Sequence, residues 1–194
     1  MESSISIIHC IRRQVCSAGL VIFERDDILL RHRPKFEDHT IGDIDAEFVA
    51  MLQDMRDLDV RFGFISHRTA RPFDTRVRID SATLTRLLDD LLKVSGAPPD
   101  FWIDAASTSD LEQDHRSQSC SELDLILKLN EWYETDLERT VIVRKAEAPR
   151  VSSDTLGLTE IFYPGLSVRA PTNISRPATV SWLKTMIKNA LDLE

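Results

Sequence analysis

Short apolar runs alternate with amphipathic stretches along most of the chain. Four of these runs are typical of strands that are buried on both faces of a sheet, at residues 20–23, 60–66, 101–105 and 140–143. Strands that alternate with helices favour a parallel sheet whose crossover connections are right-handed. The pattern therefore predicts an α/β fold of three layers, in which a Rossmann-like parallel sheet carries helices on both faces.

Apolar residues recur at helical spacing in four further windows. These windows begin at Asp43 or Asp45, at Ser81, at Ser119 or Ser121, and at Thr179. The Asp and Ser residues that open the first three windows have side chains that can cap a helix. Gly96 and the Pro98-Pro99 pair are expected to end the second helix. The stretches 70–79 and 107–118 are predicted to be loops.

The length and composition favour one soluble domain. A chain of 194 residues has the usual size of a single domain. We assign residues 1–194 to it, with 1–17 as an N-terminal extension or edge element and 166–194 as a C-terminal segment and helix. Its three cysteines have no regular spacing, which favours a reducing compartment over a disulfide framework. We therefore expect a cytoplasmic protein.

The charge balance narrows the class of partner. There are 24 Lys and Arg residues against 32 Asp and Glu residues, which gives a formal net charge of −8. An acidic chain is a poor candidate for coating nucleic acid or an anionic membrane through bulk charge. We expect neither of these partners. The overall charge still permits a local basic site that binds a small anion.

Side chains that can carry chemistry cluster where the predicted strands end. They are Glu24, Arg25, Asp26 and Asp27 after the first strand, Ser66, His67 and Arg68 after the second, Asp104 after the third, and Arg144, Lys145 and Glu147 after the fourth. In an open α/β sheet, ligands bind outside the carboxyl ends of the strands. The acids after the first strand suit magnesium-dependent phosphoryl transfer, in which one carboxylate attacks phosphorus, another donates a proton and both help hold the metal. A solvated acidic turn is the alternative.

The order of these features resembles the haloacid dehalogenase-like (HAD) superfamily, in its histidinol-phosphate and heptose-bisphosphate phosphatase branch. Residues 23–29, F-E-R-D-D-I-L, resemble the first motif of that branch, F-L-D-R-D-G-T-L. Residues 63–67, G-F-I-S-H, resemble the second motif, and the helix from Ser121 to Tyr133 with the run 141–143 resembles the approach to the fourth. The resemblance spans about residues 18–165 and implies a HAD-like fold.

The resemblance also implies roles for particular residues. Glu24 stands at the position of the nucleophilic aspartate, Asp26 at that of the acid/base aspartate, and Ser66 keeps the hydroxyl that binds phosphate. Glu24 and Asp26 are the metal ligands if a magnesium site survives. The third-motif lysine has no clear counterpart, and Arg144-Lys145 replaces the metal-binding Gly-Asp of the fourth motif. The motifs are therefore degenerate.

These departures bear directly on catalysis. A cation in place of a metal-binding carboxylate removes a ligand and adds repulsion, roughly 4 kcal/mol for two unit charges about 4 Å apart at an effective dielectric of about 20. The extra methylene of Glu24 displaces the attacking oxygen by about 1 Å, which costs on the order of a hundredfold in rate. We therefore expect a phosphatase-fold protein that is catalytically impaired or non-catalytic and that needs no cofactor, or Mg²⁺ if it is active.

Three functions stay open at this stage. In the first, the cleft binds a phosphate-bearing ligand or another small anion through Arg25, Ser66, His67, Arg68, Arg144 and Lys145; otherwise these cations pair with the neighbouring acids in a buried ion network. In the second, an active magnesium-dependent phosphomonoesterase uses Glu24 or Asp26 with Ser66 and His67. In the third, the domain is a regulatory or docking module whose protein partner contacts the C-terminal helix.

Overall fold

The computed structural model describes seven stretches of the chain, residues 6–10, 18–29, 44–66, 81–104, 122–145, 157–163 and 179–193. For residues 6–10, 26, 27, 81, 82, 104 and 122, the description is of the backbone. The predicted loops at 70–79 and 107–118 lie outside these stretches, as do His67, Arg68 and Glu147.

Six strands form one sheet at the centre of the described structure. They are β1 (Ser6–Cys10), β2 (Gly19–Glu24), β3 (Val60–Ser66), β4 (Phe101–Asp104), β5 (Thr140–Lys145) and β6 (Thr159–Tyr163), in the spatial order β1-β4-β3-β2-β5-β6. The five strands from β4 to β6 in this order are mutually parallel, and β1 pairs antiparallel with β4 at one edge. The prediction of a parallel α/β sheet is confirmed.

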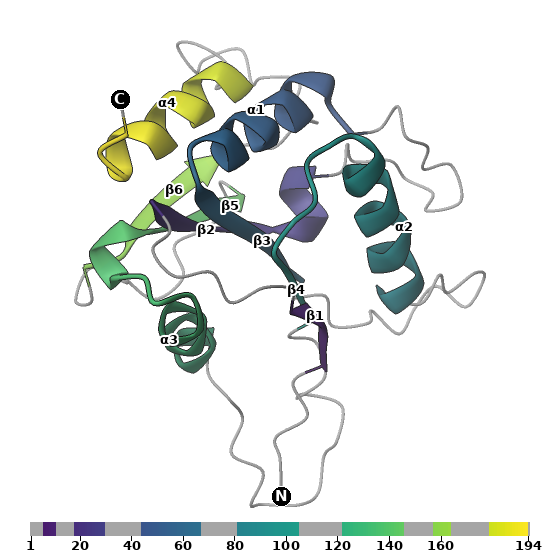
Figure 1. The fold of residues 1–194 in the computed structure, drawn as a ribbon, viewed down its shortest axis with the longest axis horizontal. Coiled ribbons are helices and arrows are strands. Elements are labelled where there is room, and N and C mark those ends of the chain that lie inside the picture. The colour runs from purple at the N-terminus through teal and green to yellow at the C-terminus, as the bar shows by residue number, and fades with distance from the viewer. Residues whose placement is uncertain are drawn as a thin grey trace, which may run out of the picture.

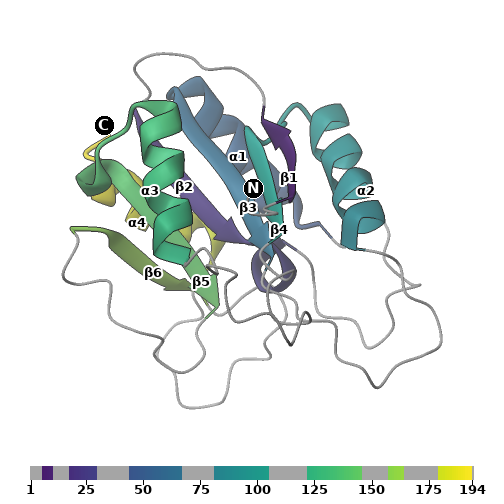
Figure 2. The same cartoon turned by 90° about the horizontal axis from the view of Figure 1, so that it is seen from below.

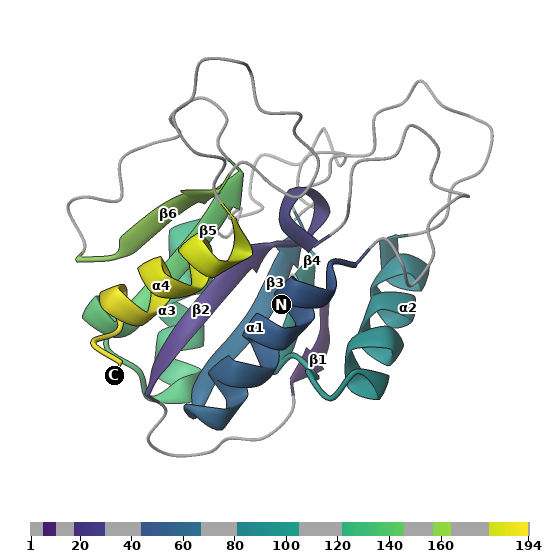
Figure 3. The same ribbon diagram turned by 90° about the horizontal axis from the view of Figure 1, so that it is seen from above.

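Helices cover both faces of the sheet. In Figure 1, α1 (Ala46–Asp57) and α4 (Val180–Ala190) lie above the sheet, α2 (Ser81–Val94) lies to its right, and α3 (Glu122–Tyr133) lies below it. Figures 2 and 3 show the two faces, with α3 in front in the first and α1 and α4 in front in the second. Two buried apolar clusters fill the corresponding interfaces: one joins the sheet to α1, α2 and α4, and the other joins it to α3.

Local sequence signals set the helix ends. The carboxylate of Asp45 accepts a hydrogen bond from the backbone N–H of Glu47 at 2.8 Å and caps α1. The hydroxyl of Thr179 caps α4 in the same way. Gly96 follows the end of α2 with a φ of 75°, a backbone conformation that favours glycine. The predicted start of α1 at Asp45 and the predicted stop of α2 are therefore confirmed.

The apolar stripe of the C-terminal helix belongs to the core. Val180, Leu183 and Ile187 of α4 are buried against the sheet and α1, whereas Trp182 and Met186 are exposed. The third function considered above needs a partner that contacts this helix, and the buried stripe is not available for it. In the described stretches, no helix is both long and apolar enough to cross a membrane.

Gly63 allows β3 to approach β4 closely. A Cβ atom at this position would lie 2.5 Å from the ring of Phe101 and 2.5 Å from its carbonyl oxygen. A backbone oxygen cannot move away as a flexible side chain would, so any larger residue here forces the two strands apart. The glycine therefore fixes the spacing of the strands that end at Ser66 and Asp104.

A polar network fixes the amino end of the sheet. The carboxylate of Asp100 accepts a hydrogen bond from the backbone N–H of Phe62 at 3.1 Å, and it pairs with Arg61 at 3.4 Å. The hydroxyl of Tyr133 donates to the carbonyl of Asp100 at 3.2 Å, which adds α3 to the network. Burial raises the pKa of the Asp100 carboxyl above 3.8, although the Phe62 hydrogen bond and the charges of Arg61 and Arg56 oppose the shift. This network lies at the opposite end of the sheet from the candidate site.

The strand boundaries differ from the prediction in one way that matters for function. The strand predicted at 140–143 continues to Lys145, so Arg144 and Lys145 belong to β5 and do not follow it. β6 is not among the predicted strands, because its sequence T-E-I-F-Y lacks a continuous apolar run. Arg144 and Glu160 are polar residues that interrupt the apolar pattern from which strands are predicted. Both lie within strands of the sheet, where they pair with each other.

Candidate functional site

The order of the strands reverses between β2 and β5. From β2 the chain runs to β3 and β4 on one side, and then returns to β5 and β6 on the other side. This reversal is a topological switch point, the position at which ligands bind in open α/β sheets. Glu24 and Arg144 lie at the carboxyl ends of the two strands that flank it. The one-turn π-helix η1 (Arg25–Leu29) follows β2 and is visible as the purple coil beyond the strand in Figure 3.

An ion network spans the switch point. Nη1 of Arg144 lies 3.4 Å from Oε1 of Glu24, and Nε of the same guanidinium lies 3.1 Å from Oε1 of Glu160. The backbone N–H of Lys145 donates to the other oxygen of Glu24 at 3.1 Å. The side chains of Arg144, Glu24 and Glu160 are only 9%, 16% and 13% exposed, so water screens these charges weakly. The guanidinium on β5 is thus shared by two carboxylates, one on each neighbouring strand, β2 and β6.

A second polar group surrounds Arg25. Its side chain is 2% exposed, and its guanidinium donates to the hydroxyl of Ser66 at 2.8 Å and to the hydroxyl of Thr85 at 2.6 Å. Ser66 ends β3 and Thr85 lies in the first half of α2. Arg25, which follows β2, therefore links the end of that strand to the end of β3 and to α2.

The sheet separates these two groups. Side chains alternate between faces along a strand, and Glu24 follows Leu20 and Ile22, which pack toward α3. Arg144 and Glu160 follow Ile142 and Leu158 on the same face. Ser66, by contrast, follows Phe62 and Phe64, which pack toward α1 and α2. The residues predicted to form one cluster thus share an edge of the sheet but lie on opposite faces.

The candidate residues are therefore placed as follows. Glu24, Arg144 and the backbone of Lys145 come together, as do Arg25 and Ser66. Asp26 lies in η1 and only its backbone is described, and His67 and Arg68 are outside the described residues. The sequence analysis does not identify two residues of the site, Glu160 and Thr85. Glu160 has an alternating-strand signal in T-E-I-F-Y, and Thr85 occupies an inward position of α2 between Leu84 and Leu88.

The carboxylate oxygens of the described site are not arranged to bind a divalent cation. Both oxygens of Glu24 already have partners that donate to them, the guanidinium of Arg144 and the N–H of Lys145. A cation beside Glu24 would lie close to the positive guanidinium, and Glu160 is bonded to that same group. Within the described stretches, no three His, Cys, Asp or Glu side chains are grouped so that they could hold a metal ion.

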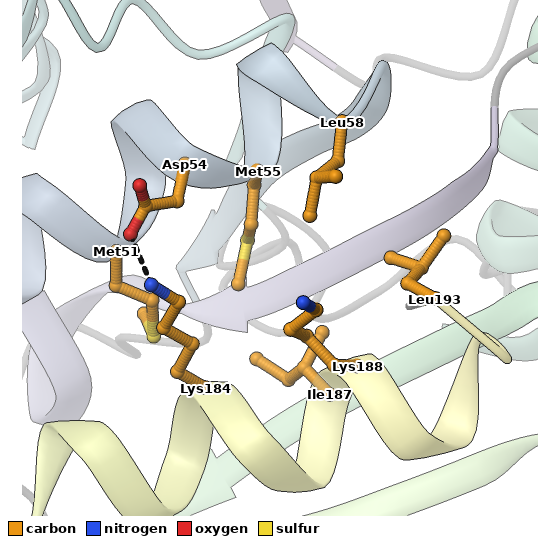
Figure 4. A pocket seen from close by; sticks show the side chains of 8 residues that line it. All are labelled: Met51, Asp54, Met55, Leu58, Lys184, Ile187, Lys188 and Leu193. Atoms are coloured by element: carbon orange, nitrogen blue, oxygen red, sulfur yellow. Dashed lines mark hydrogen bonds and ion pairs between the residues drawn. The ribbon is translucent and has the colours of Figure 1, made fainter.

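A small pocket between α1 and α4 lies apart from this site. Figure 4 shows its lining, which includes Met51, Met55, Leu58 and Ile187, with the ion pair between Lys184 and Asp54 at one side. Its volume of about 10 Å³ is room for about one water molecule. The pocket is a packing gap between two helices and contains none of the strand-end residues.

Tyr163, at the carboxyl end of β6, makes the alkaline stability of the protein sensitive to one side chain. Burial raises the pKa of its phenol above 10.0, and the charges of Asp45 and Glu47 add to the shift. The unfolded chain therefore ionises first as the pH rises, so the free energy of unfolding falls above about pH 10. In urea titrations we expect the stability of the wild type relative to Tyr163→Phe to be constant up to about pH 9 and to decline above about pH 10. A difference that does not change with pH would contradict this assignment.

Comparison with solved structures identifies the fold. The chain superposes on a D,D-heptose 1,7-bisphosphate phosphatase from B. bronchiseptica, solved with magnesium and phosphate, with a TM-score of 0.58 and 13% sequence identity over 88% of this chain and 98% of that chain. A cobalt-bound deoxy-D-mannose-octulosonate 8-phosphate phosphatase from Haemophilus influenzae matches with a TM-score of 0.48 and 12% identity, over 90% and 89% of the two chains. No protein-family model and no curated protein sequence matches the chain.

These observations define the chain as an α/β protein that shares its fold with a heptose bisphosphate phosphatase. The first match covers nearly the whole of the phosphatase, so the shared architecture is not confined to one strand–helix unit. At 13% identity the likeness concerns the fold, and the chemistry has to be argued from the residues of this chain.

Proposed function

We propose that the chain is a phosphatase-fold protein that does not carry out magnesium-dependent phosphoryl transfer. The observation that carries the proposal is the pairing of Glu24 with Arg144 across the switch point. The resemblance assigns the nucleophile to Glu24 and places the metal-binding Gly-Asp of the fourth motif on Arg144-Lys145. In this chain the guanidinium of Arg144 neutralises the carboxylate of Glu24.

The pairing weakens each step that such a reaction needs. A carboxylate that accepts hydrogen bonds from a guanidinium and a backbone N–H is a poorer nucleophile, because its charge is already stabilised. A divalent cation placed near the guanidinium is repelled more strongly than a monovalent one, and the repulsion between unit charges about 4 Å apart is already roughly 4 kcal/mol. The hydroxyl of Ser66, assigned to phosphate by the resemblance, accepts a hydrogen bond from Arg25.

The arginines at the strand ends are of the residue type that binds a small anion directly. Arg25 and Arg144 have protein partners, so a phosphate-bearing anion has to compete with them. We therefore propose that a phosphate-bearing anion binds weakly at these strand ends. Calorimetry with inorganic phosphate tests it, and no heat at millimolar phosphate would show that the cations serve only the ion network.

An assay with p-nitrophenyl phosphate tests the catalytic part of the proposal. We expect the wild type, with millimolar Mg²⁺ or Mn²⁺, to hydrolyse this substrate no faster than Glu24→Ala or Asp26→Asn. The expected rate is at the background level because nucleophile geometry, metal ligand and lysine are all altered together. Metal-dependent turnover that both substitutions abolish would instead establish an active phosphomonoesterase with altered motif residues.

A further inference from the structure

Two carboxylates and one cation form a compact unit at the switch point. Glu24 and Glu160 come from β2 and β6, and the guanidinium of Arg144 on the intervening β5 contacts both. The parallel pairing of β5 with each neighbour fixes the backbone positions of all three residues. The carboxylates therefore face one position, and a positive group occupies it.

We propose that the guanidinium of Arg144 is the resident cation of this site, and that Glu24 and Glu160 form a cation-binding pair that is revealed when the guanidinium is removed. The inference rests on the proposed function, because it requires that the wild-type site holds no divalent metal. It goes beyond the proposed function because it names Arg144 as the residue that excludes the metal, and Glu24 and Glu160 as the side chains that would bind a metal ion. Glu160 has no role in the motifs that the chain resembles.

The charges of the unit support this inference. Two carboxylates carry a charge of −2, and one guanidinium neutralises half of it. A divalent cation would neutralise all of it, and carboxylate oxygens are the ligands that Mg²⁺ and Mn²⁺ prefer. Mg²⁺ is usually held by one or two carboxylates, with water in its remaining positions. Replacing Arg144 by a short side chain leaves a space at the strand ends that such waters can enter.

The surroundings keep the two carboxylates in place. Glu24 retains the hydrogen bond from the backbone N–H of Lys145, which no substitution at position 144 removes. The two carboxylates are 16% and 13% exposed, so without a cation their repulsion is weakly screened. Relief of that repulsion adds to the affinity for a metal.

Titration with Mn²⁺ alone tests the inference on the full chain. We expect Arg144→Ser and Arg144→Asn each to bind one Mn²⁺ ion per chain, seen as loss of the free-ion signal in electron paramagnetic resonance. Their Tm should rise by about 5–10 °C when Mn²⁺ is about 100-fold above its Kd. The wild type and Arg144→Lys, which keep a cation at this position, should show neither effect. Adding Glu160→Gln to either variant should weaken Mn²⁺ binding at least about tenfold, because one charged ligand is lost.

The possible failures are distinguishable. If the wild type itself binds Mn²⁺ and hydrolyses p-nitrophenyl phosphate, the proposed function is wrong and this inference falls with it. If the wild type is inert and neither Arg144 variant binds Mn²⁺, only the inference is wrong. A variant that is unfolded without metal and folds when Mn²⁺ is added supports the inference. Variants that stay unfolded at saturating Mn²⁺ overturn the inference. If Glu24 and Glu160 could share a cation, bound Mn²⁺ would remove their repulsion and the variant would fold.

Discussion

Replacing Arg144 by methionine is expected to lower the free energy of unfolding by about 3–5 kcal/mol. Methionine keeps much of the apolar volume of the arginine stem but removes the positive charge. Glu24 and Glu160 are then left as two negative charges that water reaches poorly, since their side chains are 16% and 13% exposed. The loss of one partner from a buried ion pair is costly for this reason, even where the intact pair adds little to stability.

Urea unfolding followed by circular dichroism measures this effect, and two controls separate charge from packing. Arg144→Lys keeps the charge and loses the two-pronged geometry of the guanidinium, so it should cost less than the methionine variant. Glu24→Gln and Glu160→Gln added to Arg144→Met remove both unpaired charges and should restore stability to within about 1 kcal/mol of the wild type. If Arg144→Met costs less than about 1 kcal/mol, the network is screened as a surface pair would be.

The sequence pattern predicts most of the scaffold because burial imposes it directly. The runs that become β2, β3, β4 and β5 are buried on both faces, and such strands have continuous apolar sequences that are easy to recognise. Helix caps such as Asp45 are equally local, because one side chain satisfies a nearby backbone group. β6 is the last strand in the spatial order, at an edge of the sheet. Its sequence combines the polar residues Thr159 and Glu160 with apolar ones, so the apolar pattern that predicts a strand is weak.

The candidate site is less predictable, since it depends on the faces of the sheet as well as on its edge. Spacing along the chain places Glu24, Ser66 and Arg144 at strand ends, and the structure puts all three there. It cannot tell that Ser66 lies on one face and Glu24 on the other, because both strands are buried on both faces. A continuous apolar run has no alternation that would show on which face its last residue lies.

The partners of the cations could not be read from local sequence at all. Arg144 pairs with Glu24, which is 120 positions away, and Arg25 bonds Thr85 across 60 positions. The hydroxyl of Thr85 lies on the buried side of an amphipathic helix, where sequence analysis expects an apolar contact. The choice between an anion cleft and an ion network therefore needed three-dimensional contacts, and those contacts favour the network.

Replacing Trp102 by alanine is expected to lower the free energy of unfolding by about 3–5 kcal/mol, for reasons of packing rather than charge. The indole is 2% exposed and stacks on Phe64 with ring centroids 4.7 Å apart. Its Nε1–H donates to the carboxylate of Asp89 on α2 at 3.0 Å. The variant loses this ring from the core and leaves Asp89 without one of its donors. Because α2 also carries Thr85, the loosened helix is expected to release Arg25 from that hydroxyl.

Two variants make this prediction specific. Trp102→Phe keeps an aromatic ring beside Phe64 and loses the N–H, so its cost should be about 1–3 kcal/mol, the penalty for leaving a buried polar group without its partner. Trp182→Ala is a matched control, because Trp182 is 40% exposed on α4 and its removal should change stability by no more than about 0.5 kcal/mol. Equal costs for the two alanine variants in urea unfolding would contradict the role of Trp102, since burial and the bond to Asp89 are what distinguish them. A larger cost for Trp102→Ala than for Trp102→Phe shows that the stacked ring stabilises the fold beyond its hydrogen bond to Asp89.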